Sequence, residues 1–220
     1  MVKSIIFDWD GTLGMTLHLW LEGYRIELKK LGYDYSDDVI IKDFFYEHDK
    51  ATMKYPAIDF TALVQEVHQY IMGHVSSLKI YTGASAALEQ LRSGGITLTL
   101  VSSSPRRLLK ESLEQTGLAK FFLVFMGGDD VMLHKPSPEP FFNIIEVAKL
   151  DPRTTIIVGD SHNDIIAAYA AGVRSCLFLP NENKMFYDFG ELKKTNPTHC
   201  VESLQEFVDL VMSINQATMK

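Results

Sequence analysis

The chain has 220 residues, of which 46% are hydrophobic and 22% are charged. These proportions are typical of a soluble globular protein, and the length allows one large core or one core with a small accessory domain. The formal net charge of −7 argues against a nucleic-acid partner, because the phosphate backbone would be repelled. A small anionic ligand stays compatible with this charge if local cations hold it, since salt screens the overall field beyond about 8 Å.

The cysteines and the hydropathy pattern bear on location. Cys176 and Cys200 form no Cys-x-x-Cys pair, so we expect two ordinary packed thiols in a reducing compartment. We expect no leader before the first strand, and no uncharged run approaches the roughly 18 apolar residues of a membrane span. The sequence therefore predicts a cytoplasmic protein without a membrane partner.

The first residues predict a buried strand that ends in two acids. The apolar run 5–7 is followed by Asp8, Trp9 and Asp10, and then by an Asp-Gly turn. Side chains two residues apart on a strand point to the same side, so we expect the two carboxylates to lie together. Their repulsion calls for a cation, a hydrogen-bond donor or water. The alternative is that Asp8 is a solvated strand end and Asp10 only opens the turn.

The hydrophobic spacing between residues 14 and 82 predicts helices and no strand. The expected helices begin at Leu17, Asp37 and Ile58 and end before Gly32, at His48 and at Val75. We interpret this stretch as a helical insertion that follows the first strand.

From Gly83 onward, expected helices alternate with strands. The expected strands cover residues 96–101, 121–125, 154–158, 175–179 and 199–201. Ser104 with Pro105 is typical of a helix start, and Ser203 with Glu206 forms a capping box for the last helix. This alternation predicts a mostly parallel α/β sheet covered on both sides, which binds ligands beyond the carboxyl ends of its strands.

Three further polar clusters follow strands or precede helices in this part. Asp160 follows a strand and lies four residues before Asp164, so the two face the same way if a helix begins there. Ser102 and Ser103 end another strand, and Lys135 lies in a proline-rich loop before a helix. Singly, each has a simpler interpretation: an N-cap with an exposed helix residue, a solvated loop, and a solvated lysine.

Together, these clusters predict a phosphate site with a metal ion. Four carboxylates would converge on one edge of the sheet, beside an ammonium group, hydroxyls and backbone donors. Carboxylate oxygens suit Mg²⁺. Phosphoryl transfer needs an in-line nucleophile, neutralisation of the phosphoryl oxygens and a proton for the leaving group.

With these motifs in place, the chain resembles the haloacid dehalogenase superfamily, in its phosphoglycolate phosphatase-like branch with a C1 helical cap. Asp8-Trp-Asp10-Gly-Thr is similar to the first motif, the strand ending in Ser102 to the second, Lys135-Pro136 to the third, and Gly159-Asp160 to Asp164 to the fourth. The resemblance implies an α/β fold with a Rossmannoid three-layer core and a mostly parallel sheet. It assigns residues 1–13 and 83–220 to the core and 14–82 to an α-helical cap domain inserted after the first strand.

The resemblance also implies catalytic roles. Asp8 would attack phosphorus and form an aspartyl-phosphate. Asp10 would protonate the leaving oxygen and then activate the hydrolytic water. Ser102 would hydrogen-bond the phosphoryl oxygens, and Lys135 would neutralise their charge. The residues expected to bind the phosphate are Gly11, Ser102, Ser103 and Lys135.

The implied cofactor is Mg²⁺ and the implied substrate is a small phosphorylated metabolite. Asp8, the backbone carbonyl of Asp10, and Asp160 would bind the ion, and Asp164 would support these ligands without touching it. Cap residues would set the choice of substrate. His18 and two other basic residues of the expected cap, Arg25 and Lys54, could contact an anion, although a solvated helix residue is the simpler interpretation of each.

Two departures from the family pattern limit any statement on substrate. Gly14-Met15-Thr16 stands where related phosphatases commonly have an acid or serine, and His134 stands before the lysine, where a small residue is common. The oligomeric state is not predicted by the sequence.

The resemblance leaves four alternatives to a phosphatase. A sugar-phosphate phosphomutase shares all four motifs, and it would use cap closure to exclude water. A dehalogenase lacks the second acid and a phosphonatase usually replaces it, so Asp10 argues against both. A receiver-like signalling module is about half as long and carries no cap.

Overall fold

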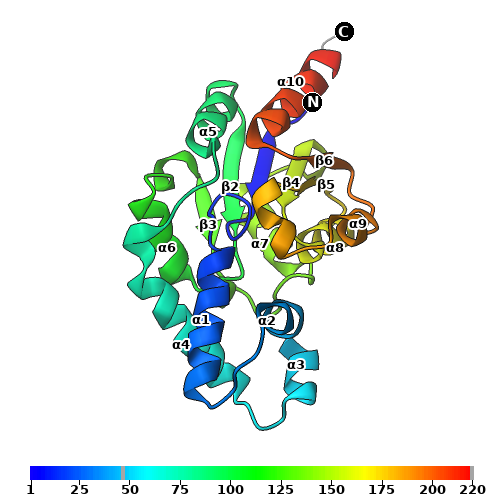
Figure 1. The fold of residues 1–220 in the computed structure, drawn as a ribbon. Helices are drawn as coiled ribbons and strands as arrows, with labels where there is room; N and C mark the ends of the chain where they lie inside the picture. The colour runs from blue at the N-terminus through cyan, green and yellow to red at the C-terminus, as the bar shows by residue number, and fades with distance from the viewer. Residues whose placement is uncertain (46–47, 219–220) are drawn as a thin grey trace. The chain divides into compact units, whose positions relative to one another are not determined.

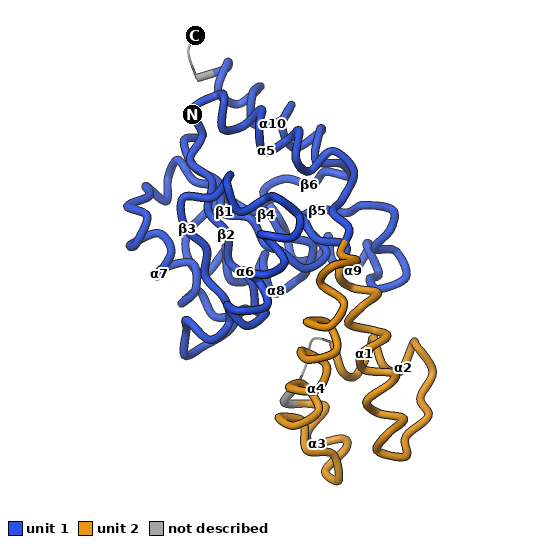
Figure 2. Tube along the Cα trace, turned by 90° about the vertical axis from the view of Figure 1, so that its left-hand side faces the viewer, with its two compact units in different colours: residues 1–15, 79–220 blue, residues 16–78 orange. Residues whose placement is uncertain are grey.

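The computed structural model describes residues 1–45 and 48–218. These residues form two compact units, one made of 1–15 with 79–220 and one made of 16–78 (Figure 2). The second unit lies inside the stretch 14–82 that the sequence marks as helical. The expected helix 37–48 includes residues 46 and 47, which lie outside the described residues.

The first unit contains a parallel sheet. Its strands among the described residues are β1 (Ser4–Phe7), β2 (Thr97–Val101), β3 (Val124–Met126), β4 (Thr155–Gly159), β5 (Arg174–Phe178) and β6 (His199–Val201). They lie in the order β3-β2-β1-β4-β5-β6, and each neighbouring pair is parallel. β1 is a central strand and is buried along its length, as its apolar sequence predicts. The predicted α/β fold is confirmed.

One predicted strand is wrong at its start. Residues 119–121 of the apolar run form a short 3₁₀ turn, in which the Phe121 N–H donates to the Leu118 carbonyl. The chain first pairs with the sheet at Leu123, whose N–H donates to the Leu98 carbonyl. Strand β3 begins at the next residue. The apolar side chain of Phe121 is buried, and burial alone does not distinguish a turn from a strand.

Helices cover both faces of the sheet (Figure 1). In this unit they are α5 (Ala84–Ser93), α6 (Arg106–Gln115), α7 (Glu139–Ala148), α8 (His162–Ala170), α9 (Phe189–Lys193) and α10 (Leu204–Thr218). Ile6 of β1 packs in one buried cluster with Ile144 of α7 and Ala167 of α8. The next residue, Phe7, points to the opposite face and stacks edge-on against Phe207 of α10.

Local helix signals were partly confirmed. Ser203 accepts from the Glu206 N–H at 3.2 Å, which is one half of the predicted capping box. The Glu206 carboxylate accepts from the Glu202 N–H at 2.7 Å, one residue before the partner that a capping box requires. Ser104 does not cap α6, because the N-cap position is held by Pro105 and the Ser104 hydroxyl is used elsewhere. The short helix α9 and the 3₁₀ turn Asn181–Met185 were not predicted, since neither carries a full helical repeat.

In the described part of the second unit the helices are α1 (Leu17–Lys30), α2 (Asp37–Phe44), α3 (His48–Lys54) and α4 (Phe60–Gly73), followed by a 3₁₀ turn at Val75–Ser77. Its buried side chains are mostly aliphatic, and an aromatic group packs among them. In that group the Phe44 ring stacks on Tyr55 and Phe60, at centroid distances of 5.1 and 5.5 Å. Helices α1 and α4 approach closely at Gly23, where a Cβ atom would lie 3.1 Å from Val67. A larger residue at position 23 would push the two helices apart.

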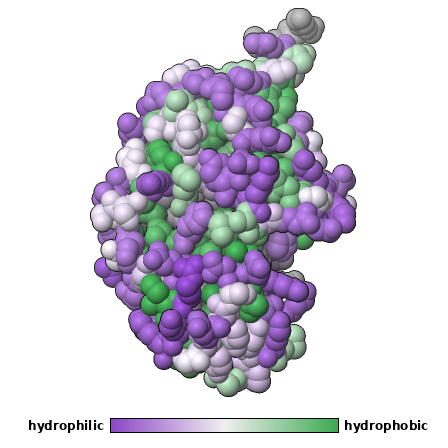
Figure 3. Space-filling view, in the orientation of Figure 1, coloured by the Kyte–Doolittle hydropathy of each residue, from purple (hydrophilic) through white to green (hydrophobic). Residues whose placement is uncertain are grey.

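Hydrophilic residues cover much of the face seen in Figure 3, with hydrophobic patches between them. None of the helices in the described ranges combines the length and the hydropathy needed to cross a bilayer. Cys176 is buried and Cys200 is exposed, so the expectation of two packed thiols holds only for Cys176.

Candidate active site

The site lies at the carboxyl ends of the central strands of the first unit. Asp8 follows β1, Ser102 follows β2 and Asp160 follows β4. β1 pairs with both other strands, so their ends lie at one edge of the sheet. The Asp8 N–H continues the β1–β4 ladder by donating to the Val158 carbonyl at 2.9 Å, which fixes the backbone from which the Asp8 side chain leaves.

Lys135 joins the first and last acidic motifs. Its Nζ donates to Asp8 Oδ1 and to Asp164 Oδ1, each at 2.6 Å. The exposed fractions of the three side chains are 5%, 7% and 1%. The interpretation of Lys135 as a solvated loop lysine is therefore wrong, as is that of Asp164 as an exposed helix residue.

The start of α8 fixes Asp164. Ser161 is the N-cap, and its hydroxyl donates to Asp164 Oδ2 at 2.6 Å. The predicted alternative that Asp160 is the N-cap is therefore wrong. Its side chain is buried instead. A Cβ atom at Gly159 would lie 2.3 Å from Asp164 Cγ, so only glycine fits beside this carboxylate. This close approach is the physical reason for a glycine before Asp160.

Asp10 contacts hydroxyl groups that follow β2. Its Oδ2 accepts from Ser102 Oγ at 3.1 Å and from Ser104 Oγ at 2.9 Å. The Ser104 N–H also donates to Ser102 Oγ at 3.0 Å. Asp10 therefore does more than open a turn, and Ser104 serves this cluster rather than the helix end.

The structure gives less support to Gly11 and Ser103, the other two residues expected to bind phosphate. Gly11 has a left-handed φ of 74°, which favours glycine, and its N–H donates within its own turn to the Gly14 carbonyl at 3.0 Å. Ser103 is exposed. The binding of phosphate by either residue stays a prediction.

Sequence reasoning missed several residues of the site. Asn183 is 1% exposed, and its amide reaches both Gly11 and Asp160. Tyr81 donates a hydroxyl hydrogen bond to Asn183. The Thr12 hydroxyl donates to Asp8 Oδ2 at 3.4 Å. A preceding proline at position 180 marks a turn before Asn183, but no local signal links this residue to the acids.

Burial and mutual repulsion shift the charges of the site. Burial raises the pKa of Asp8 to about 7, helped by the charges of Asp164 and Asp10 and opposed by Lys135. Burial also raises the pKa of Asp160, and the charge of Asp8 adds to this. Burial alone would lower the pKa of Lys135, but the charges of Asp164 and Asp8 outweigh it and raise that pKa. The site thus holds more negative charge than its one ammonium group balances.

The donor set suits a divalent cation. Asp8, Asp160 and Asp164 each offer an oxygen atom, and these atoms lie within 4.8 Å of one another. Three carboxylates and the Lys135 ammonium carry a net charge of −2 when all are ionised. A divalent ion would neutralise that charge, and hard oxygen ligands are those that Mg²⁺ and similar ions prefer.

Comparison with known proteins places the chain in a family. The model of the haloacid dehalogenase-like hydrolases matches residues 5–178. A phosphoglycolate phosphatase from Yersinia pseudotuberculosis is 33% identical over 153 residues, a match spanning 70% of this chain and 63% of that enzyme. The pyrophosphatase PpaX from Oceanobacillus iheyensis is 27% identical over 214 residues, spanning 96% of this chain and 97% of that one.

The fold comparison agrees. A hydrolase from Pseudomonas syringae superposes with a TM-score of 0.82 at 18% identity, covering 96% of this chain and 99% of that one. At this identity the likeness shows the fold alone. The family match covers both ends of the acidic site, from Asp8 to Asp164. The predicted family is confirmed: this chain belongs to the haloacid dehalogenase-like hydrolases.

Proposed function

We propose that this protein is a Mg²⁺-dependent phosphatase that hydrolyses a small phosphorylated metabolite through an aspartyl-phosphate. The observation that carries the proposal is the buried carboxylate of Asp8, held by Lys135 at 2.6 Å among further acids at the end of a central strand. The relatives named as a phosphoglycolate phosphatase and a pyrophosphatase support it.

In the first step, an oxygen of the Asp8 carboxylate attacks phosphorus in line with the ester bond. The new bond from this oxygen to phosphorus forms while the bond from phosphorus to the ester oxygen breaks. Asp10 gives its proton to the leaving oxygen, which departs as an alcohol. Lys135 lies beside Asp8 and stabilises the negative charge of the phosphoryl oxygens.

In the second step, water attacks the phosphorus of the aspartyl-phosphate. Asp10, now a carboxylate, takes a proton from this water. The bond from phosphorus to Asp8 breaks, inorganic phosphate leaves, and both carboxyl groups return to their starting protonation. Ser102 donates to Asp10 at 3.1 Å, and in this proposal its hydroxyl turns to a phosphoryl oxygen when the substrate is bound.

The residues that would hold the metal ion are Asp8, the backbone carbonyl of Asp10, and Asp160. When bound, Mg²⁺ neutralises charge on the phosphoryl oxygens and orients the ester. In this proposal Asp164 holds Lys135, through the 2.6 Å hydrogen bond, and does not bind the ion itself.

The proposal includes the organisation and location expected from the sequence. Residues 1–13 and 83–220 form the catalytic core, and 14–82 form a cap that selects the substrate. The protein acts in the cytoplasm on a small molecule, with neither nucleic acid nor membrane as a partner. The phosphoglycolate and pyrophosphate named in the relatives are the first substrates to try.

The test is release of inorganic phosphate by the purified chain. A panel of sugar phosphates, phosphoglycolate, pyrophosphate and p-nitrophenyl phosphate is assayed with Mg²⁺ and with EDTA. We expect metal-dependent release of phosphate from at least one small phosphate ester. The Asp8→Asn variant, purified in the same way, is the control for a contaminating phosphatase. No release from any compound would overturn the proposal, and an isomerised sugar phosphate without hydrolysis would indicate a phosphomutase.

A further inference from the structure

A buried asparagine connects two parts of the site that are far apart in the sequence. Asn183 lies in the turn Asn181–Met185 and is 1% exposed. Its Nδ2 donates to the Gly11 carbonyl at 2.9 Å and to Asp160 Oδ2 at 3.1 Å. Gly11 follows Asp10 in the first motif, whereas Asp160 begins the fourth. One amide group therefore holds both motifs.

The orientation of this amide is fixed by a third group. The Tyr81 hydroxyl donates to Asn183 Oδ1. With the amide turned over, Oδ1 would face two acceptors, the Gly11 carbonyl and the Asp160 carboxylate in the ionised form that a cation requires. Only the orientation with Nδ2 toward these two acceptors satisfies all partners.

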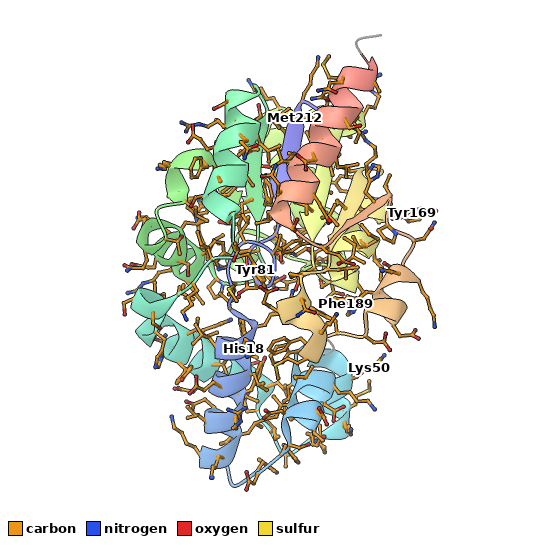
Figure 4. The ribbon with its side chains drawn as sticks, turned by 45° about the horizontal axis from the view of Figure 1, so that its top comes forward. His18, Lys50, Tyr81, Tyr169, Phe189 and Met212 are labelled. Atoms are coloured by element: carbon orange, nitrogen blue, oxygen red, sulfur yellow. The ribbon has the colours of Figure 1, made fainter. Side chains whose placement is uncertain are left out.

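Tyr81 is itself held rigidly. Its N–H donates to the Leu13 carbonyl at 3.0 Å, and its ring meets Phe178 edge-on at 5.4 Å. Figure 4 shows Tyr81 among the crowded side chains in the middle of the view, whereas the side chain of Tyr169 reaches outward at the edge. Burial raises the pKa of Tyr81, so its hydroxyl keeps the proton that it donates.

Asp160 needs such a support. It is buried near Asp8 and Asp164, and one carboxylate oxygen from each of these three residues lies within 4.8 Å of the other two. Repulsion favours a rotation of Asp160 away from its neighbours, and a neutral donor opposes that rotation without adding charge. Asn183 gives Asp160 one such donor, and the Tyr187 hydroxyl gives it another. Of the two, Asn183 also holds the first motif.

We propose that Asn183, oriented by Tyr81, is a positioning residue that holds Asp160 and the Gly11 turn ready for the metal ion. This inference rests on the proposed function, because it assigns the acidic cluster to a cation. Asn183 touches neither the ion nor the substrate, and it acts through Asp160. Loss of its amide should therefore weaken metal binding more than it weakens folding.

The test measures Mn²⁺ binding directly, by the electron paramagnetic resonance signal of the free ion, with no substrate present. Asn183→Leu keeps the side-chain size and removes the donor, and we expect it to bind Mn²⁺ about 10- to 100-fold more weakly. Tyr81→Phe keeps the ring and Asn183, and we expect a loss of about two- to tenfold, the range of one hydrogen bond.

The matched control is Asn215→Leu. Asn215 also bonds two partners, the N–H and the carbonyl of Val2, but it lies in α10 away from the acids. We expect this variant to unfold at a lower temperature and to bind Mn²⁺ as the unmodified protein does. Thermal unfolding of all variants, in EDTA, separates a loss of stability from a loss of metal affinity.

Three outcomes would overturn the inference. Unchanged Mn²⁺ affinity in both Asn183→Leu and Tyr81→Phe would do so while leaving the proposed function intact. An equal loss in Asn215→Leu would show a general effect of destabilisation. If the unmodified protein bound Mn²⁺ no better than Asp160→Asn, the acidic cluster would not be a metal site. The proposed function and the role of Asn183 would then both be wrong. Should Asn183→Leu not fold, Tyr81→Phe decides alone.

Discussion

Ion pairs of nearly equal length lie in opposite surroundings in the two units of this protein. In the first unit, Lys135 pairs with Asp8 and Asp164 at 2.6 Å, with exposed fractions of 5%, 7% and 1%. In the helical unit, Arg25 pairs with Asp37 at 2.7 Å, with exposed fractions of 44% and 43%. Distance alone does not distinguish the two sets, whereas burial does.

This difference separates function from stability. A buried ion pair costs several kcal/mol of desolvation per ion, and hydrophobic residues of the same size often stabilise a fold as well or better. An exposed pair contributes about 0–1 kcal/mol and costs little to keep. The buried charges at the sheet edge are therefore best explained by chemistry, while Arg25, once a candidate for anion binding, is engaged with Asp37.

The largest effect is expected at the nucleophile. Asp8→Asn keeps the shape of the side chain and removes its nucleophilic oxygen, so we expect turnover to be abolished with the fold retained. Phosphate release and circular dichroism measure the two properties. Activity near that of the unmodified protein would remove Asp8 from its role and would leave the buried set without a catalytic purpose.

The second effect separates Asp10 from Asp8. Asp10→Ala should slow hydrolysis of an alkyl phosphate by about 10²- to 10⁴-fold, the range of general acid catalysis, because the alkoxide then leaves without a proton. An aryl phosphate with a good leaving group, such as p-nitrophenyl phosphate, should lose less. The comparison of kcat/KM for the two esters checks this, and an equal loss would count against the assignment.

The third effect tests the cost of the buried charges. Lys135→Met leaves Asp8 and Asp164 without their shared cation, so we expect a loss of about 3–5 kcal/mol in the free energy of unfolding at neutral pH. Urea unfolding in EDTA measures it. Lys110→Met, which breaks an exposed pair with Glu114, serves as the control. Equal stability of the two variants would show that burial does not set the cost of breaking these ion pairs.

The fourth effect is a pH dependence of the metal-free protein. The pKa of Asp8 rises from 3.8 to about 7 on folding, so between these values the folded protein holds a proton that the unfolded chain has lost. Stability should therefore fall as pH rises through this window. We expect the unfolding temperature in EDTA to be lower at pH 8 than at pH 5.5, and less so in Asp8→Asn. A parallel fall in both proteins would contradict the assignment.

The smallest effect is expected at the exposed pair. Arg25→Gln should change the free energy of unfolding by less than about 1 kcal/mol, because solvent and salt screen this interaction. Urea unfolding at low and high salt measures the change. A loss comparable with that of Lys135→Met would show that exposure does not decide the value of these pairs.

Much of the fold and of the acidic site follows from local sequence. One strand ends directly before Asp8, another before Ser102, and a third before Asp160. Because parallel strands bring their carboxyl ends to one edge, residues that follow different strands meet there without any knowledge of their distances. The alternation of helices and strands in the sequence was enough to predict the parallel sheet, and with it the meeting of these residues at one edge.

Only the tertiary structure decided how each polar group is satisfied. Ser104 suits a helix cap by its local preference, yet it bonds Asp10, which is 94 residues away. Asn183 reaches Gly11 across 172 residues, and no periodicity marks it. Sequence patterns report which face of an element is buried, because periodicity is local. The partners of a buried polar group depend on packing between distant segments, and that is settled only when the chain has folded.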